Sequence, residues 1–485
     1  MFAPATAITH LWRVNREPAT QASIQVRRPR ALYGTFLLFS TVLLFAPLRS
    51  GDLAGYDDAH FAHIAKDIVV TGDWMNLRSN GAHVLEHPPL FVWMQAALFR
   101  AFHLSDALAR LPSALCGWGV ILLVYGLASR VLNGSAAPLL AMFVMATSIY
   151  FLKYAARAMT DVPFTFLCLC ALYAWLRREE DARACAIAGA FAGLAQLTRG
   201  LMGIALPVVF AIDLALHPPR PPRRYVALAF ALAFVPLIAW YAEIIYANRG
   251  HFWEDYSAWL DREAFGALSP PWRRYTGIFE YAWMLSKSYW PWLPFMLSGL
   301  VAGVRAGDRR LRLLILWTAV VYVLCAAAKS RVLRYLLPAY PVFAVFAAMS
   351  LAKRIPPRWL SASLSAAAAM LAVLAAGVAL FPRNSSHAAE IRPIAAAATA
   401  ATPPGVRVAF YDSGQPRLDE ANQLQWYGDR YLDIMTKPEQ LSRELSAPGP
   451  RTYVVDRETY QRRFASLPHR VLADSGHLLC LRLLQ

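Results

Sequence analysis

Long blocks of apolar residues that hold no charge, or in one case a single charge, alternate with short polar segments along most of the chain. A helix that crosses a bilayer needs about 20 mostly apolar residues, and eleven of these blocks approach that length. They cover 31–48, 111–129, 136–152, 162–176, 184–198, 200–216, 225–242, 288–304, 313–328, 335–352 and 359–382. The pattern therefore predicts a mainly α-helical, polytopic membrane protein with about 11 transmembrane helices (range 11–13) plus juxtamembrane helices.

The apolar segment 88–104 also carries Gln95, Arg100 and His103, so its place must be decided by charge. If it does not span and the N-terminus is cytoplasmic, most basic loops lie inside, as the positive-inside rule prefers. If it spans, all of them move outside. We therefore predict a helix along the membrane surface. The inside loops are then those at Arg130, 177–183, 220–224, 305–312 and 353–358.

This topology divides the chain into three parts. Residues 1–30 form a polar cytoplasmic tail, and 31–382 form the membrane domain, whose first outer loop is 49–110. Residues 383–485 are polar and mixed, which predicts a small periplasmic α/β domain. Its expected strands are Val406–Tyr411, Thr452–Val455 and Leu478–Leu484, and its expected helices are Pro438–Leu445 and Glu458–Phe464.

Composition narrows the class of protein further. Only 16% of the residues are charged and 57% are hydrophobic, whereas roughly a quarter are charged in soluble domains. A soluble enzyme, a disulfide scaffold and a disordered chain are therefore excluded. The net charge of +17 does not predict nucleic acid as a partner, because the basic residues lie mainly between apolar blocks. Gly189 and Gly193 form a GxxxG pattern, for which helix packing is the expected role.

The outer loops hold acids and bases that topology does not explain. Asp57 and Asp58 open a helix, where acids also cap the N-terminus. His60 and His63 share a helix face and could bind a metal with a nearby acid, although a solvated polar face is the alternative. Glu86 precedes His87 and a pair of prolines. It is either an acid in a turn or an acid of the functional site.

Asp161 lies at the outer mouth of a span, where an acid is costly unless it is solvated or paired. Arg199 occupies a tight outer turn, and Lys329, Arg331 and Arg334 lie where the positive-inside rule expects few cations. Acids suit a general base or a metal ligand, and cations suit phosphate. A lipid phosphate substrate would satisfy both.

These motifs resemble a known family. Asp57-Asp58-Ala-His-Phe-Ala is similar to the Asp-Glu-x-x-Tyr-Ala first loop of the membrane-embedded glycosyltransferases of the C fold (GT-C). The resemblance is to the branch of the protein O-mannosyltransferases and the bacterial lipid A aminoarabinose transferase. Further matches follow in order at Gly72–Trp74, Leu85–Pro89, Ala109–Leu115, Asp161–Pro163, Leu197–Gly200 and Arg334–Pro341.

The resemblance implies transfer of one sugar from a polyprenyl (undecaprenyl) phosphate carrier to an acceptor on the outer face, with inversion. Asp57 would be the general base toward the acceptor hydroxyl, and Asp161 and Glu86 would position the acceptor, the sugar or a metal. The carrier phosphate would be held by Arg199, Lys329, Arg331 and Arg334.

The sequence departs from the family motifs at three positions, where His87 and Arg199 replace lysines and Asp58 replaces a glutamate. Asp58, His60 and His87 are auxiliary candidates. A divalent metal ion stays an open possibility, with Asp57, His60, His63 and Asp161 as candidate ligands.

The leading hypothesis is a glycosyltransferase of the bacterial inner membrane, with a cytoplasmic N-terminus and a periplasmic C-terminus. Its partners would be membrane lipid, a polyprenyl-phosphate-linked sugar donor, and an acceptor that is lipid A, another envelope glycan or a protein. The alternative is a flippase for the carrier-linked sugar, which would need no base. Transporters often show internal halves and acids at the bilayer midplane, and the sequence shows neither.

Overall fold

The structure is a computed structural model of the whole chain. It describes residues 29–53, 56–85, 87–217, 221–248, 250, 252–260, 273–328, 331–381, 386–411, 418–446 and 451–484. The expected tail 1–30 lies outside these residues except for its last two. Glu86 and Lys329, two of the predicted site residues, lie outside them as well.

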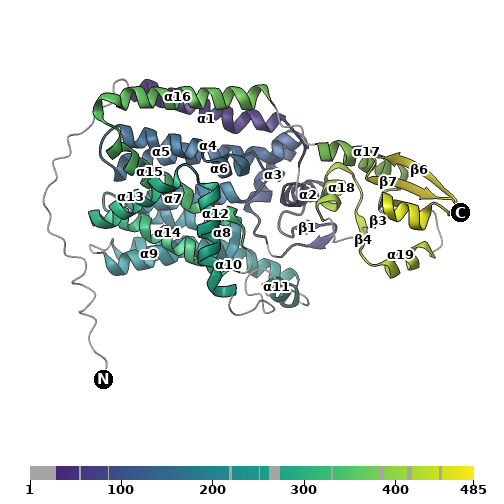
Figure 1. Cartoon of the computed structure of the whole chain (residues 1–485). Helices are drawn as coiled ribbons and strands as arrows, with labels where there is room; N and C mark the ends of the chain where they lie inside the picture. Colours follow the sequence, from purple (N-terminus) through teal and green to yellow (C-terminus); the bar gives the residue numbers. More distant parts are fainter. Residues whose placement is uncertain are drawn as a thin grey trace.

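A helical bundle makes up most of the molecule, and a smaller unit follows at one end of it (Figure 1). The bundle contains α1 (Pro29–Phe45), α4 (Asp106–Val131), α5 (Ala136–Ala146), α6 (Ile149–Ala155), α7 (Asp161–Leu176), α8 (Ala184–Arg199), α9 (Ala205–Leu216), α10 (Arg223–Ala247), α12 (Arg273–Ser288), α13 (Leu293–Ala306), α14 (Arg309–Ala327), α15 (Tyr340–Arg354) and α16 (Pro357–Leu380). Near the junction lie α2 (Tyr56–Thr71), the hairpin β1 (Arg78–Ser79) and β2 (Ala82–His83), α3 (Leu90–Ala101) and α11 (Phe252–Leu260).

The apolar helices confirm a polytopic membrane protein. Within the described residues, seven helices are long and apolar enough to span, or eight if the bent pair α5–α6 is one span. The predicted spans 162–176 and 288–304 coincide with the shorter apolar helices α7 and α13. Every predicted span therefore has a helical counterpart, and eleven stays the predicted number.

The stretch from α8 to α9 turns back on itself. As one straight helix its 33 residues would be about 50 Å long. Arg178, six positions before α8, nevertheless forms an ion pair with Asp213 near the end of α9. The reversal occurs at Gly200, whose φ of +50° suits glycine because it has no Cβ. The separate spans predicted on either side of Gly200 are thereby supported.

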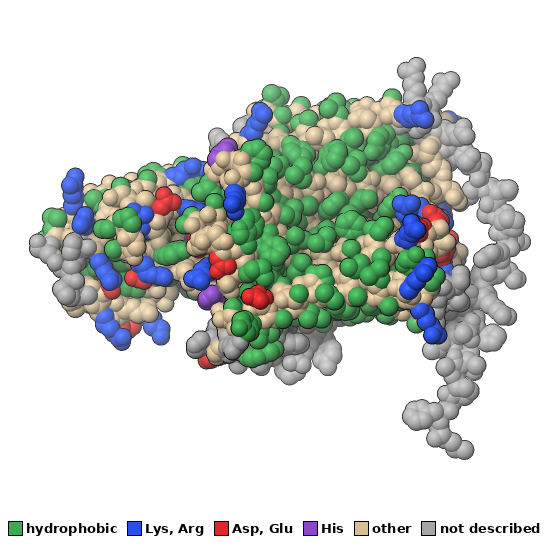
Figure 2. All heavy atoms as spheres, turned by 180° about the vertical axis from the view of Figure 1, so that it is seen from behind, with side chains coloured by type: hydrophobic (Ala, Val, Ile, Leu, Met, Phe, Trp, Pro, Cys, Tyr) green, Lys and Arg blue, Asp and Glu red, His purple; other side chains and the backbone are tan. Residues whose placement is uncertain are grey.

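Charged loops gather at the end of the bundle opposite the smaller unit. Arg130 pairs with Glu180, Arg309 pairs with Glu179, and Arg310 donates to the backbone oxygen of Arg130 at 2.8 Å. Three loops predicted to lie inside thus meet at one end. A broad hydrophobic band separates this basic end from the smaller unit (Figure 2).

Close helix packing explains the GxxxG pattern. A Cβ at Gly189 would overlap the backbone carbonyl of Ala229 on α10, and one at Gly193 would overlap that of Leu232. The two glycines let α8 and α10 approach closely, as small residues do between membrane helices. Helix α3, predicted along the surface, has 12 residues and is about 18 Å long, too short for a hydrocarbon core of about 30 Å.

The smaller unit is a five-stranded sheet covered by helices on both faces. The strand order is β4-β3-β5-β7-β6, with β4, β3 and β5 parallel and β7 antiparallel to its neighbours. Alternate strand residues face α17 and α18 on one side and α19 on the other. The elements are α17 (Ser386–Ala401), β3 (Val408–Tyr411), α18 (Leu418–Tyr427), β4 (Leu432–Met435), α19 (Pro438–Leu445), β5 (Thr452–Asp456), α20 (Arg457–Thr459), β6 (His469–Asp474) and β7 (Leu478–Leu483). The predicted small C-terminal α/β unit is confirmed.

Candidate active site

Helix α2 carries the first-loop acids in its first turn, where carboxylates complement the helix dipole. One face of α2 is apolar and packs with α3 in a common core that includes Ala62, Ile64 and Phe91. Asp57 lies outside this core and its side chain is 22% exposed. The apolar face thus fixes the helix and directs Asp57 toward the bundle.

Asp161 begins α7 and is almost fully buried, with 1% of its surface exposed. It forms an ion pair with Arg199, which is the last residue of α8. A buried carboxylate is costly unless it is paired. The turn at Gly200 brings Arg199 to the point where α7 starts.

Arg334 connects the two acids. It lies in a 3-10 helix, η6 (Leu333–Ala339), and its Nη2 is 2.8 Å from Oδ2 of Asp57. Its Nε is 3.9 Å from Oδ1 of Asp161. The ring of Tyr335 supports both guanidinium groups, at 4.7 Å from Arg199 and 5.7 Å from Arg334.

Asp57, Asp161, Arg199 and Arg334 form what we call the acid–arginine cluster. Four separate elements contribute to it, and it lies at the bundle end nearest the smaller unit. Nε of Arg334 is buried and has no hydrogen-bond acceptor among the described residues. Since guanidinium groups bind phosphate bidentately, this cluster can hold a phosphate beside a carboxylate that accepts a proton.

Asp58 connects α2 to the loop before α7. It is buried and accepts a hydrogen bond from the backbone N–H of Ala158, in the loop before Asp161. Arg157 and Arg110 lie within electrostatic reach. Arg110 in turn donates to the backbone oxygens of residues 50–52, just before α2. Asp58 thus fixes α2 relative to α7.

Burial raises the pKa of the Asp58 carboxyl to about 7, although Arg157 and Arg110 lower it. The stability contributed by the protonated form is therefore fully present below about pH 4 and is lost as the pH rises through about 7. Asp58→Asn removes this titration. We expect the free energy of unfolding of Asp58→Asn, relative to that of the wild type, to increase between pH 4.5 and pH 7.5 by at most about 4 kcal/mol. Thermal midpoints in detergent across this range test it, and a pH-independent difference would contradict it.

His87 and His60 lie beside the cluster. The His87 ring is 5.2 Å from the Phe61 ring and 5.9 Å from the His60 ring, between centroids. Burial lowers the pKa of His87 to about 4, while Asp57 raises it and Arg199 lowers it. His87 is therefore neutral near pH 7 and does not replace the positive charge of the family's lysine.

The metal candidates do not gather. Across the described part of the chain, no three His, Cys, Asp or Glu side chains are placed to hold a metal ion. Asp57 and Asp161 are engaged by arginines, and His63 accepts a hydrogen bond from the backbone N–H of Asn80 at 3.1 Å. The residues described here thus do not fit a resident metal.

Arg331 pairs with helix α12: its guanidinium contacts Thr276 and Glu280 at 2.9 and 2.7 Å. Its predicted role in phosphate binding stays a prediction. Arg110 and Tyr335 were not predicted as site residues. Both stand inside the quoted motifs at Ala109–Leu115 and Arg334–Pro341, and this was the signal that could have identified them.

Known proteins resemble the chain over much of its length. The family model of the dolichyl-phosphate-mannose-protein mannosyltransferases matches residues 86–240. An undecaprenyl phosphate-alpha-4-amino-4-deoxy-L-arabinose arabinosyl transferase of Proteus mirabilis is 24% identical over 316 residues, 63% of this chain. The chain spans 56–58% of the length of the first curated relatives it matches.

Solved structures show the same fold. The crystal structure of ArnT from Cupriavidus metallidurans bound to undecaprenyl phosphate has a TM-score of 0.74 at 18% identity, and covers 93% of this chain and 98% of that one. The archaeal oligosaccharyltransferase AglB from Archaeoglobus fulgidus has a TM-score of 0.58 at 13% identity, with 88% and 70% covered. The motifs, the matched family model and the shared fold agree: the chain has the GT-C fold and is similar to the membrane proteins of the protein O-mannosyltransferase and ArnT group.

Proposed function

We propose that this protein transfers a monosaccharide from a polyprenyl phosphate carrier to an acceptor hydroxyl at the outer face of the bacterial inner membrane. The observation that carries the proposal is the acid–arginine cluster, with a buried Arg334 N–H that lacks an acceptor in the described chain. The donor class is taken from the relatives, which are named as undecaprenyl phosphate-alpha-4-amino-4-deoxy-L-arabinose arabinosyl transferases.

In this mechanism Asp57 takes the proton of the acceptor hydroxyl as its oxygen attacks the anomeric carbon. The bond between that carbon and the carrier phosphate oxygen breaks, with inversion. Arg199 and Arg334 stabilise the negative charge that grows on the departing phosphate. Asp161 holds both arginines in place through its ion pairs. Glu86, outside the described residues, keeps its proposed role in positioning the acceptor or the sugar.

The proposed acceptor is a glycolipid anchored in the same membrane. The cluster lies at the ends of α7 and α8, where the head group of a lipid would meet it at the bilayer surface. In the corresponding topology the tail 1–30 is cytoplasmic, whereas the loop 49–110 and residues 383–485 are periplasmic. The charged loops at the opposite end support this orientation.

The acceptor can be identified with purified protein in liposomes. A panel of undecaprenyl-phosphate sugars, labelled in the sugar, would be supplied together with envelope lipids, glycans or proteins. We expect label to move from the carrier into the lipid fraction. Label in the protein fraction alone would overturn the acceptor class, and no transfer from any donor would overturn the proposed function.

A further inference from the structure

Helix α18 of the C-terminal unit contacts the chain on both sides of Asp57. Four positions before Asp57, the backbone of Leu53 is held twice. Its N–H donates to the Tyr427 hydroxyl at 2.9 Å, and its carbonyl accepts from Gln423 at 2.7 Å. Leu53 itself is fully buried. Two side chains of α18 thus satisfy both backbone groups of one residue in the first loop.

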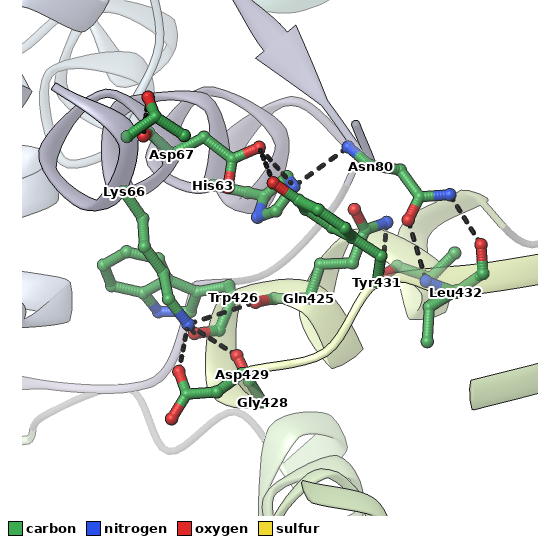
Figure 3. A network of polar contacts seen from close by, with 12 residues as sticks. His63, Lys66, Asp67, Asn80, Gln425, Trp426, Gly428, Asp429, Tyr431 and Leu432 are labelled. Atoms are coloured by element: carbon green, nitrogen blue, oxygen red, sulfur yellow. Dashed lines mark hydrogen bonds and ion pairs between the residues drawn. The ribbon is translucent and has the colours of Figure 1, made fainter. Parts of the chain in front are cut away.

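Nine positions after Asp57, Lys66 reaches the C-terminal end of the same helix (Figure 3). Its ammonium donates to the backbone oxygens of Gln425, Trp426 and Gly428, and pairs with Asp429 at 2.8 Å. The side chain is only 10% exposed. The last carbonyls of a helix have no partner within the helix, and a cation there also suits the dipole. Lys66 therefore caps α18.

Apolar packing also joins α18 to the helices of the first loop. Trp426 of α18 lies in the core that α2 and α3 share, and its ring centroid is 5.4 Å from that of Phe99. Its indole N–H donates to Asp106 at the start of α4, at 2.7 Å. The C-terminal unit therefore contributes a side chain to the interior that supports α2.

A second contact between the two units lies further along. Asn80, in the β1–β2 turn, exchanges two hydrogen bonds of 2.8 Å with the backbone of Leu432 on β4 (Figure 3). Strand β4 is an edge of the sheet, and Asn80 continues its hydrogen bonding. The unit thus contacts the first loop at Leu53, Lys66 and Asn80, none of which belongs to the acid–arginine cluster.

We propose that α18 positions the catalytic acid: Lys66 and Tyr427 fix α2 along its axis and thereby hold Asp57 at the reaction centre. This inference rests on the proposed function. General base catalysis needs the carboxylate within hydrogen-bond reach of the reacting hydroxyl, and a misplacement of 1 Å can cost about 100-fold in rate. A clamp on both sides of Asp57 meets that requirement.

The test uses Lys66→Met and Tyr427→Phe in the full-length protein, with Lys353→Met at the opposite end of the bundle as the matched control. We expect each of the two clamp variants to lower kcat by about 10-fold to 100-fold, with the KM for the sugar donor within about twofold of wild type. The control variant should retain wild-type kcat. Tyr427→Phe removes one hydroxyl only, so it keeps the test open if Lys66→Met folds poorly.

The same substitutions in an Asp57→Asn background separate positioning from general damage. If the clamp acts through Asp57, Lys66→Met causes no further loss of the residual transfer there. An equal fold-loss in both backgrounds would overturn the inference, as would wild-type kcat in both clamp variants. A wild-type protein without transfer would instead overturn the proposed function itself.

Discussion

Asp57→Asn is expected to reduce sugar transfer by about 10²–10⁴-fold, the range over which a positioned general base contributes. The amide of asparagine has nearly the shape of the carboxylate but cannot take the proton from the hydroxyl of the sugar acceptor. The donor should still bind, because the arginines are unchanged and Arg334, freed from Asp57, gains capacity for phosphate. Single-turnover transfer and a separate donor-binding assay measure the two effects.

The matched control is Asp181→Asn, an exposed acid in the loop at the opposite end of the bundle. It should transfer at the wild-type rate. Full activity in Asp57→Asn would remove this residue from the base role. A loss of donor binding as large as the loss of rate would assign Asp57 to binding instead.

Arg334→Gln is expected to lower kcat/KM by about 10²–10³-fold, the usual cost of deleting one donor that stabilises a charge formed in the transition state. Arg334 pairs with both acids, and its Nε has no hydrogen-bond acceptor in the described chain. Arg334→Lys keeps the charge but not the planar fork, so it should fall between wild type and Arg334→Gln. Steady-state kinetics with varied donor would check this order.

Arg331→Gln provides the comparison. Its guanidinium contacts Thr276 and Glu280 rather than the acids of the cluster. We expect a change in kcat/KM of less than about tenfold, since these contacts engage the Arg331 guanidinium at α12, whereas Arg334 lies between the two acids of the cluster. A larger loss in Arg331→Gln than in Arg334→Gln would reverse this assignment of the carrier phosphate.

Much of the architecture could be predicted from the chain alone. A bilayer span leaves a long uncharged block, and the basic loops between blocks fix which ends meet. The same count of spans placed the loops of Asp57, Asp161, Arg199 and Arg334 on one side of the membrane. It therefore predicted that these four residues share one end of the bundle. Their ion pairs confirm that they do.

The short elements of the C-terminal unit were harder to predict. Strands β3, β5 and β7 appear as apolar runs because they are the buried centre of the sheet. Strands β4 and β6 lie at the edges, carry fewer buried side chains and were missed. Helix α18 was missed as well, because many of its buried residues are polar.

The pairing within the site could not be predicted either. Four cations were candidates for phosphate, and the sequence does not show that α12 supplies Glu280 to Arg331. Such contacts join residues far apart in the chain, and no local pattern records them. For the same reason Lys66, a lysine on a loop helix, gave no sign that it caps α18.

In the proposed mechanism the sugar leaves its carrier at the acid–arginine cluster, with Asp57 as the base. The most direct measurement is a single turnover in liposomes that contain envelope lipids as acceptor, with undecaprenyl-phosphate sugar labelled in both parts, comparing wild type with Asp57→Asn. Wild type is expected to release undecaprenyl phosphate and labelled product in equal amounts, while Asp57→Asn binds the donor and leaves it intact. Donor that crosses the bilayer unbroken in both proteins would rule out this mechanism and identify a flippase.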